Sequence, residues 1–191
     1  MPLKPKQPRI EPLSPPFSQD ARTALELLGH SPIQLFRMWA RRPELAHSIA
    51  GWGRYYFSRR CALTLRQREL IIDRTTALCG AGYEWAVHVA TFAEKAELDA
   101  TQLNSLATGD PTQDCWDTAD RAVLRAVDEL HATSDLSDET WAGLTAVLDE
   151  DAALELILIC GWYHAISFTV RALRLPPEPG TESMAALVEM D

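Results

Sequence analysis

Several features that would identify a function at once are missing from this sequence of 191 residues. No apolar run reaches the roughly 18 residues that a membrane-spanning helix needs, and the proline-broken N-terminal region lacks the apolar core of a signal peptide. A net charge of −9 argues against nucleic acid as a partner. We therefore expect a cytoplasmic protein that has neither a membrane nor a nucleic acid as its partner.

A dithiol motif and a zinc motif are also missing, because the four cysteines are widely spaced and form no CxxC pair. Free thiols are the simplest interpretation in a cytosolic chain of this length. Three of the histidines show no ligand spacing either, so we expect no metal site and no cofactor. The residues concerned are Cys61, Cys79, Cys115 and Cys160, with His30, His47 and His131.

Alternating strand patterns are absent, whereas apolar residues recur at helical spacing from residue 18 to residue 175. Glycine and proline interrupt this periodicity often enough to predict an all-α fold of about eight helices. Two long apolar helices, within 70–96 and 152–175, are expected to pack together. Six of the twelve prolines fall in the first sixteen residues, which predicts an extended segment there. The predicted organisation is a proline-rich arm at 1–16, a single helical domain at 17–180 and a tail at 181–191.

One short stretch, 78-LCGAGYEWAVHVA-90, concentrates reactive side chains. Glu84 and His88 are four residues apart, so on a helix they share one face with Cβ atoms about 6 Å apart. If the chain folds back at the two glycines, Glu69 on the preceding helix can approach His88. A carboxylate beside an imidazole raises the imidazole pKa and orients its tautomer, which suits a general acid or base. A surface Glu–His pair beside a helix-end glycine is the purely structural alternative.

Three segments resemble the carboxymuconolactone decarboxylase superfamily, which includes the AhpD-like alkylhydroperoxidases. They are the central run 66-RQRELIIDRTTALCGAGYEWAVHVATFAEKAELDATQL-103, the lead-in 35-LFRMWARRPELAHSIAGWGRYYF-57 and the C-terminal 155-ELILICGWYHAISFTVRALRLPPE-178. The resemblance covers roughly residues 32–178. It implies an AhpD-like all-α fold, assembly into a homo-oligomer such as a dimer, trimer or hexamer, and a pocket at the subunit contacts.

The redox branch of this superfamily carries a glutamate, a CxxC pair twelve residues later, and a histidine four residues after the second cysteine. By this resemblance Glu69 and His88 occupy the glutamate and histidine positions, whereas Ala81 and Glu84 occupy the two cysteine positions. Thiol peroxidase chemistry needs a thiolate, which alanine and glutamate do not supply. The decarboxylase branch has a glutamate four residues before its histidine, so the sequence is more similar to that branch here.

The resemblance therefore implies a cofactor-independent lyase that acts on a small carboxylated or lactone-type substrate. In this hypothesis His88 is the general acid and base, Glu84 orients and charges it, and Glu69 completes a relay or anchors the pocket. Two alternatives stay open. One is an oxidoreductase of the alkylhydroperoxidase or peroxiredoxin type that uses Cys79, and the other is a non-catalytic oligomeric binding protein.

The neighbours of the Glu–His pair have two interpretations each. Tyr83 is expected either to donate a hydrogen bond to a substrate anion or to pack at the helix start, and Trp85 and Ala81 are placed beside it in the predicted substrate site. Arg74 is interpreted as a salt-bridge partner rather than a substrate clamp. His164 is interpreted as a hydrogen-bonded core histidine, with the pocket as the alternative.

The cysteine of the central stretch is expected to be structural. Cys79 lies two residues before the first cysteine position of the redox branch, and on a helix two residues turn a side chain by about 200°. We therefore expect Cys79 to be a small buried residue, and the same holds for Cys160 within the apolar C-terminal helix.

Overall fold

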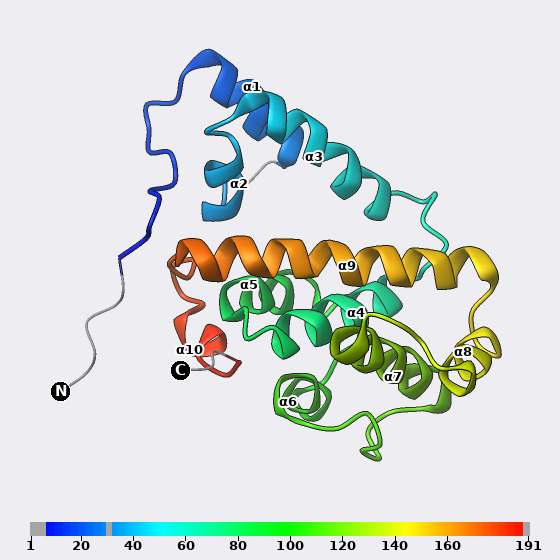
Figure 1. Cartoon of the computed structure of the whole chain (residues 1–191). Helices are drawn as coiled ribbons and strands as arrows, with labels where there is room; N and C mark the ends of the chain where they lie inside the picture. Colours follow the sequence, from blue (N-terminus) through cyan, green and yellow to red (C-terminus); the bar gives the residue numbers. More distant parts are fainter. Residues whose placement is uncertain (1–6, 30–31, 189–191) are drawn as a thin grey trace.

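The computed structural model describes residues 7–29 and 32–188. Within these residues it contains ten α-helices and no strand, so the predicted all-α class is confirmed (Figure 1). The helix number exceeds eight because the chain divides around Pro43 into two helices and because a short helix lies within the predicted tail. The helices are α1 (Gln19–Leu28), α2 (Gln34–Trp39), α3 (Pro43–Tyr56), α4 (Leu65–Leu78), α5 (Gly82–Phe92), α6 (Ala100–Thr108), α7 (Thr118–Thr133), α8 (Asp138–Thr145), α9 (Glu150–Leu173) and α10 (Glu182–Ala185).

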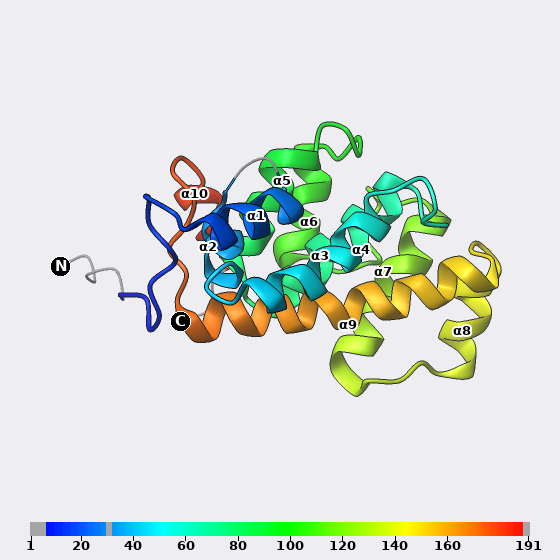
Figure 2. The same ribbon diagram turned by 90° about the horizontal axis from the view of Figure 1, so that it is seen from above.

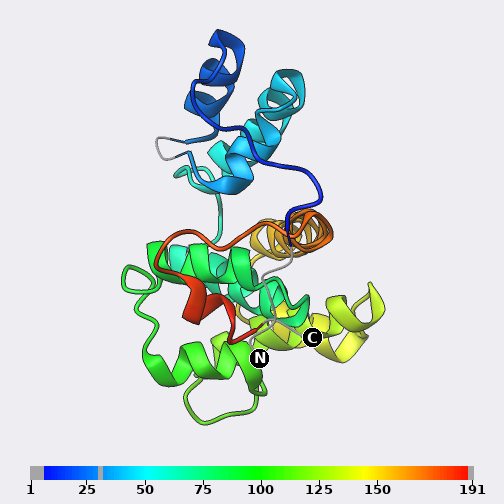
Figure 3. The ribbon, with the colours of Figure 1, turned by 90° about the vertical axis from the view of Figure 1, so that its left-hand side faces the viewer.

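Helix α9 is the central element of the fold. It lies between α1 to α3 on one side and α4 to α8 on the other (Figures 1 and 3), and it extends along most of the molecule when seen from above (Figure 2). Both α4 and α5 contact it, which confirms the predicted packing of 70–96 against 152–175. By length and composition α9 is apolar enough to cross a membrane, and half of its most apolar window is buried inside the protein.

The reversal between α4 and α5 depends on Gly80. This residue has φ of 63°, in the left-handed region that glycine adopts without a steric penalty. The N–H of Ala81 donates to the carbonyl of Thr76 at 2.8 Å, and the N–H of Gly80 donates to the carbonyl of Ala77 at 2.8 Å. These bonds close the end of α4 as glycine-terminated helices usually do. The chain therefore turns back at once, and α5 packs against α4.

The first three helices form a layer that contacts α9 through aromatic and carboxylate side chains. Trp52 of α3 stacks on Trp162 of α9 with ring centroids 5.3 Å apart. The carboxylate of Glu155 on α9 accepts hydrogen bonds from the Tyr55 hydroxyl and, at 2.8 Å, from the backbone N–H of Ala62. These contacts fix the connection between α3 and α4 on α9.

Both end segments contact the helical domain. In the predicted arm, the N–H of Arg9 donates to the carbonyl of Leu173 at the end of α9 at 2.9 Å, while residues 1–6 lie outside the described residues. In the predicted tail, α10 packs against α5 and buries Ala185. The arm therefore contacts the end of α9, whereas the tail contacts α5, the helix that carries His88.

Candidate active site and a second side-chain cluster

The three side chains that the sequence predicts as an acid–base group meet in the structure. Glu69 reaches across from α4 to α5, where Nδ1 of His88 lies 2.8 Å from its Oε2. Glu84, one turn before His88 on α5, has its Oε1 3.6 Å from His88 Nε2. Glu69, Glu84 and His88 are 0 %, 4 % and 5 % exposed. They form a buried group, and the alternative of a surface pair is therefore wrong.

Asp73 and Tyr163 complete this group, which we call the His88 cluster. The Tyr163 hydroxyl, from α9, lies 3.1 Å from His88 Nε2. Asp73 lies one turn after Glu69 on α4, and one donor atom each of Glu69, Asp73 and His88 lie within 4.8 Å of one another. Among the described residues, neither oxygen of Asp73 has a hydrogen-bond partner. Three carboxyl groups therefore surround one imidazole with few compensating donors.

The environment of His88 favours its protonated form. Burial by itself lowers the pKa of His88, but the charges and hydrogen bonds of Glu69 and Glu84 outweigh burial and raise the pKa to about 10. At neutral pH the ring therefore carries both protons. One N–H donates to Glu69, and the other faces Glu84 and Tyr163. Burial, followed by the negative charges of the cluster, raises the pKa of Tyr163 well above its usual range, so this side chain remains a phenol.

Asp73 is the second proton-holding group of the His88 cluster. Burial is the main reason why the pKa of Asp73 lies well above its usual range, and the charges of Glu69 and Glu84 raise it further against the opposing effect of His88. The cluster therefore combines a protonated imidazole with a carboxyl group whose raised pKa favours its protonated form. A proton that passes from one member of this set to another leaves its total charge unchanged, whereas each proton given to a substrate lowers it by one unit.

An aromatic pair closes the His88 cluster. The ring of Phe92, at the end of α5, has its centroid 5.4 Å from that of His88, and Phe57 stacks on Phe92 at 5.3 Å. Phe57 is 48 % exposed, so it forms the outer surface of this cover. The Arg68 guanidinium lies 5.9 Å from the Phe57 ring centroid, and its buried Nε has no hydrogen-bond partner in the part of the chain that is described. A cation therefore flanks the cover.

The residues predicted to bind substrate pack around the start of α5. The Tyr83 hydroxyl donates to Oε1 of Glu178 at 2.6 Å and accepts from the Leu35 N–H at 3.0 Å, so both of its roles are already satisfied away from His88. Trp85 is 1 % exposed and Ala81 is fully buried. Within the single chain, packing at the start of α5 therefore accounts for the positions of these three side chains.

The interpretation of Arg74 as a structural residue agrees with its contacts. Its Nε and Nη2 donate to the two carboxylate oxygens of Asp128 on α7 at 2.6 and 2.9 Å. Its Nη1 donates to the carbonyls of Leu106 and Gly109, each at 3.1 Å. Arg74 thus joins α4 to α6 and α7, and no donor of its head group points at His88.

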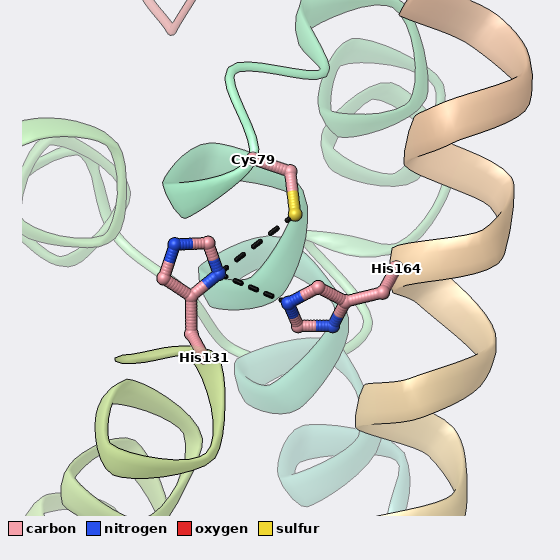
Figure 4. Close-up of side chains that lie close together, drawn as sticks. All are labelled: Cys79, His131 and His164. Carbon is pink, nitrogen blue, oxygen red and sulfur yellow. Dashed lines mark hydrogen bonds between the residues drawn. The ribbon is translucent and has the colours of Figure 1, made fainter. Parts of the chain in front are cut away.

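A second cluster lies at the end of α4, where Cys79, His131 and His164 point toward one another from three helices (Figure 4). Nδ1 of His131 on α7 lies 3.9 Å from Cys79 Sγ and 2.9 Å from Nε2 of His164 on α9. The three side chains line a groove of about 1040 Å³. Cys79 is buried, as expected, but its sulfur faces this groove. His164 is hydrogen-bonded, as expected, but it is only half-buried and lines this groove instead of the core.

Two groups of potential metal ligands thus exist in the part of the chain that the structure describes, Cys79 with His131 and His164, and Glu69 with Asp73 and His88. In the second group the 2.8 Å contact with Glu69 already occupies Nδ1 of His88. The sequence-based expectation of no metal site considered only ligands close in the sequence, and it did not cover a group assembled from three helices.

Sequence reasoning missed several members of both clusters. Asp73 had a usable signal, because it follows Glu69 by four residues and therefore shares its helix face. Tyr163 and His131 had none, since they reach their partners only through the packing of α7 and α9. Arg68 was overlooked although it directly precedes Glu69.

Comparison with known proteins agrees with the resemblance noted from the sequence. The model of the carboxymuconolactone decarboxylase family matches residues 43–129, and this confirms the resemblance to that superfamily. No curated protein sequence matches the chain significantly.

Solved structures with a similar fold are also found. An uncharacterized peroxidase-related protein from Silicibacter sp. TM1040 aligns with a TM-score of 0.77 at 16 % identity, covering 95 % of this chain and 98 % of the other. The debrominase Bmp8 aligns in its apo form with a TM-score of 0.72 at 18 % identity, covering 95 % and 98 %. A cysteine-to-alanine variant of Bmp8 in complex with 2,3,4-tribromopyrrole aligns with 0.71 at 20 %, covering 97 % and 100 %. At these identities the likeness establishes the AhpD-like fold.

Proposed function

From the match to the carboxymuconolactone decarboxylase family, we propose that this chain is a cofactor-independent lyase in which His88 transfers protons to and from a small carboxylated or lactone-type substrate. The observation that carries the proposal is the position of His88. Its ring is buried between Glu69, Glu84 and Tyr163, and its pKa is raised to about 10. The family match supports an enzyme of this general kind, and the finer assignment rests on the geometry of the cluster.

The proposed chemistry is proton delivery at carbon. When a carboxylate leaves as CO₂, the electron pair of the broken bond stays on the substrate and must be neutralised by a proton. The protonated Nε2 of His88 supplies that proton, while the bond from Nδ1 to Glu69 holds the ring in place. An oxygen of Asp73 lies within 4.8 Å of a ring nitrogen of the resulting neutral imidazole but is not hydrogen-bonded to it. In this proposal Asp73 returns the proton through an intervening water molecule.

We propose that the substrate approaches through the aromatic cover. Phe57 and Phe92 separate His88 from the surface, and Arg68 lies against the outer ring. A substrate carboxylate that meets the Arg68 guanidinium gains an ion pair just outside a cluster of carboxyl groups. Arg68 takes the anion-binding role in this proposal because the Tyr83 hydroxyl already has two partners.

The test is a comparison of two histidine variants on a small panel of lactone carboxylates that includes 4-carboxymuconolactone. His88→Gln should lower turnover by about 100-fold or more, the usual contribution of a general acid or base. His47→Gln is the matched control, because His47 is exposed on α3. Circular dichroism and the thermal midpoint establish that each variant is folded. Undiminished turnover in a folded His88→Gln protein would show that the assigned role is wrong.

Peroxide reduction by Cys79 is the first alternative, and the geometry supports it less well. The sulfur of Cys79 contacts His131 rather than the Glu69–His88 pair, and burial raises the pKa of its thiol, which disfavours the reactive thiolate. Mass spectrometry after mild peroxide treatment tests it. Sulfenic acid or a mixed disulfide at Cys79 would favour this alternative over the lyase.

A non-catalytic oligomeric binding protein is the second alternative, and the enclosure of His88 is the observation that favours it. Self-association is a proposal for either function. Leu154, Leu158 and Phe168 on α9 are 56 %, 43 % and 65 % exposed. Covering such apolar side chains with a second subunit would stabilise an oligomer. A cytoplasmic location also remains a proposal. Sedimentation analysis of the purified chain would determine the subunit number.

A further inference from the structure

We propose that Cys79, His131 and His164 bind a divalent transition-metal ion of the zinc type. The three side chains come from the end of α4, the last turn of α7 and the middle of α9, and they converge on one point (Figure 4). One thiolate and two imidazoles are the soft sulfur and nitrogen donors that Zn²⁺ and its neighbours prefer. The proposal concerns a different group of residues from the His88 cluster.

The distances fit a tetrahedral ion. With Zn–S near 2.3 Å and Zn–N near 2.0–2.1 Å, tetrahedral angles place sulfur and nitrogen about 3.6 Å apart and two nitrogens about 3.3 Å apart. The structure has 3.9 Å from Cys79 Sγ to His131 Nδ1 and 2.9 Å from His131 Nδ1 to His164 Nε2. All three donor atoms lie within 4.8 Å of one another. The Cys79–His131 and His131–His164 separations therefore differ from the ideal values by less than about 0.5 Å.

A hydrogen bond behind His164 prepares its nitrogen for a metal. Nδ1 of His164 lies 2.8 Å from the carbonyl oxygen of Cys160, one turn earlier on the same helix, so the Nδ1–H donates to this carbonyl. That bond leaves the lone pair of Nε2 free to face His131 and Cys79. Metal-binding histidines usually donate their other N–H to a carbonyl or carboxylate in this way.

The backbone around Cys79 is held equally well. The guanidinium of Arg171 on α9 donates from Nη1 to the carbonyl of Cys79 at 2.7 Å, and the glycine turn that follows fixes the end of α4. Two ligands on helices and one at a closed helix end give the small positional freedom that a metal site requires.

The groove that Cys79, His131 and His164 line would give a bound ion access to a further ligand. Three protein ligands around a tetrahedral ion leave a fourth place for water or a substrate atom, which is the pattern of catalytic rather than structural zinc. The groove is lined mainly by apolar side chains and also by the cationic Arg171, so an anionic or polarised ligand suits this place. The wall residues include Leu78, Leu130, Ile157 and Phe168.

Binding must release a proton from the protein. The thiol of Cys79 gives up its proton to become the sulfur ligand, and the proton on His131 moves from Nδ1 to Nε2 so that Nδ1 can bind. One M²⁺ ion therefore replaces one proton, and the ion with its thiolate keeps a net charge of +1. No oxidant or reductant is involved.

The experiment uses the reduced full-length chain, freed of metal with a chelator and titrated with CoCl₂ and ZnCl₂. We expect one Co²⁺ per chain, with the strong visible bands of a four-coordinate ion and a thiolate-to-cobalt charge-transfer band, and we expect Zn²⁺ to displace it. Cys79→Ser should remove the charge-transfer band and weaken Zn²⁺ binding by about 100-fold or more. Cys115→Ser is the matched control and should keep both.

Two further measurements keep the proposal testable if Cys79→Ser does not fold. His164→Asn should weaken Zn²⁺ binding, whereas His88→Gln should leave it unchanged. In the wild-type chain, Zn²⁺ should protect Cys79 from alkylation while Cys61 reacts as before. Absence of the thiolate band, its survival in folded Cys79→Ser, or loss of binding in His88→Gln alone would overturn the assignment.

Discussion

Replacing Asp73 by asparagine should stabilise the protein, and the gain should grow with pH. Burial, together with the negative charge of Glu69, raises the pKa of Asp73 well above its ordinary value of 3.8 in the folded chain. In the unfolded chain the same carboxyl group ionises at its ordinary pKa. Between these two pKa values the folded state holds a proton that the unfolded state has lost. The free energy of unfolding therefore falls as the pH rises through this window.

The size of this effect follows from proton counting. For one proton, each pH unit within the window lowers the free energy of unfolding by about 1.4 kcal/mol. Asparagine has nearly the shape of the neutral Asp73 side chain but cannot ionise. The free energy of unfolding of Asp73→Asn therefore does not fall with pH for this reason. The two proteins should have similar stability near pH 4. Above that pH the variant should gain on the wild type by about 1.4 kcal/mol per pH unit until Asp73 ionises in the fold.

The assay is urea unfolding of the wild type and Asp73→Asn at several pH values from 4 to 8, with equal denaturant slopes as the condition for comparison. Asp114→Asn is the control, because Asp114 is fully exposed and should show no such trend. Parallel stability curves for the wild type and Asp73→Asn would mean that Asp73 is already ionised in the fold. A variant that is less stable at every pH would mean that Asp73 has a compensating partner. Either result would refute the reasoning.

Two other substitutions test the buried charges of α4 and α5. Arg74→Ala should lower the free energy of unfolding by about 3 kcal/mol, because it leaves Asp128 without its bidentate partner. Arg125→Ala, which breaks an exposed pair with Glu139, is the control. It should lower the free energy of unfolding by less than about 1 kcal/mol in the same urea experiment. The pKa of His88 is about 10 in the folded chain and 6.5 in the unfolded chain. Its charged form therefore contributes its full stabilisation below pH 6.5, and this contribution is lost as the pH rises through 10. His88→Gln should therefore destabilise most below pH 6.5 and progressively less toward pH 10 in thermal unfolding, and a constant difference across this range would show that His88 is neutral in the fold.

The parts of the fold and site that the sequence predicts are those that short-range rules govern. The helical periodicity gives the fold class, and the spacing of Glu84 and His88 places both on one helix face. The glycine break between the two helices correctly suggests that Glu69 can reach His88. These inferences succeed because each concerns neighbours within a helix or across a single turn.

The parts that it misses depend on how distant helices pack. His131 and His164 approach Cys79 only because α7 and α9 both lie against the end of α4, and no sequence spacing encodes that approach. Burial is missed for a related reason. Spacing alone allowed Glu84 and His88 to be a surface pair, and only the packing of α9 and of the aromatic cover makes them a buried cluster.

The helical register of α4 places the thiol of Cys79 and the Glu69–His88 pair on different faces of that helix. Glu69 and Asp73 are four residues apart and share the face that meets α5, where His88 lies. Thr75 and Cys79 are also four residues apart, and they share the face that meets α9 and α7, where the Thr75 hydroxyl contacts the sulfur of Cys160. At about 100° per residue, the two faces differ by roughly 120°.

Bringing the thiol of Cys79 to the Glu69–His88 pair would therefore require α4 to rotate about its axis by roughly this amount. Every residue of α4 from Glu69 to Ala77 is buried, so such a rotation would break its packing on all sides at once. A mechanism that combines Cys79 with His88 would need that rearrangement. Two clusters that act independently on different faces of α4 need no such rearrangement. Substitutions in one cluster should therefore leave the spectroscopic and catalytic readouts of the other unchanged.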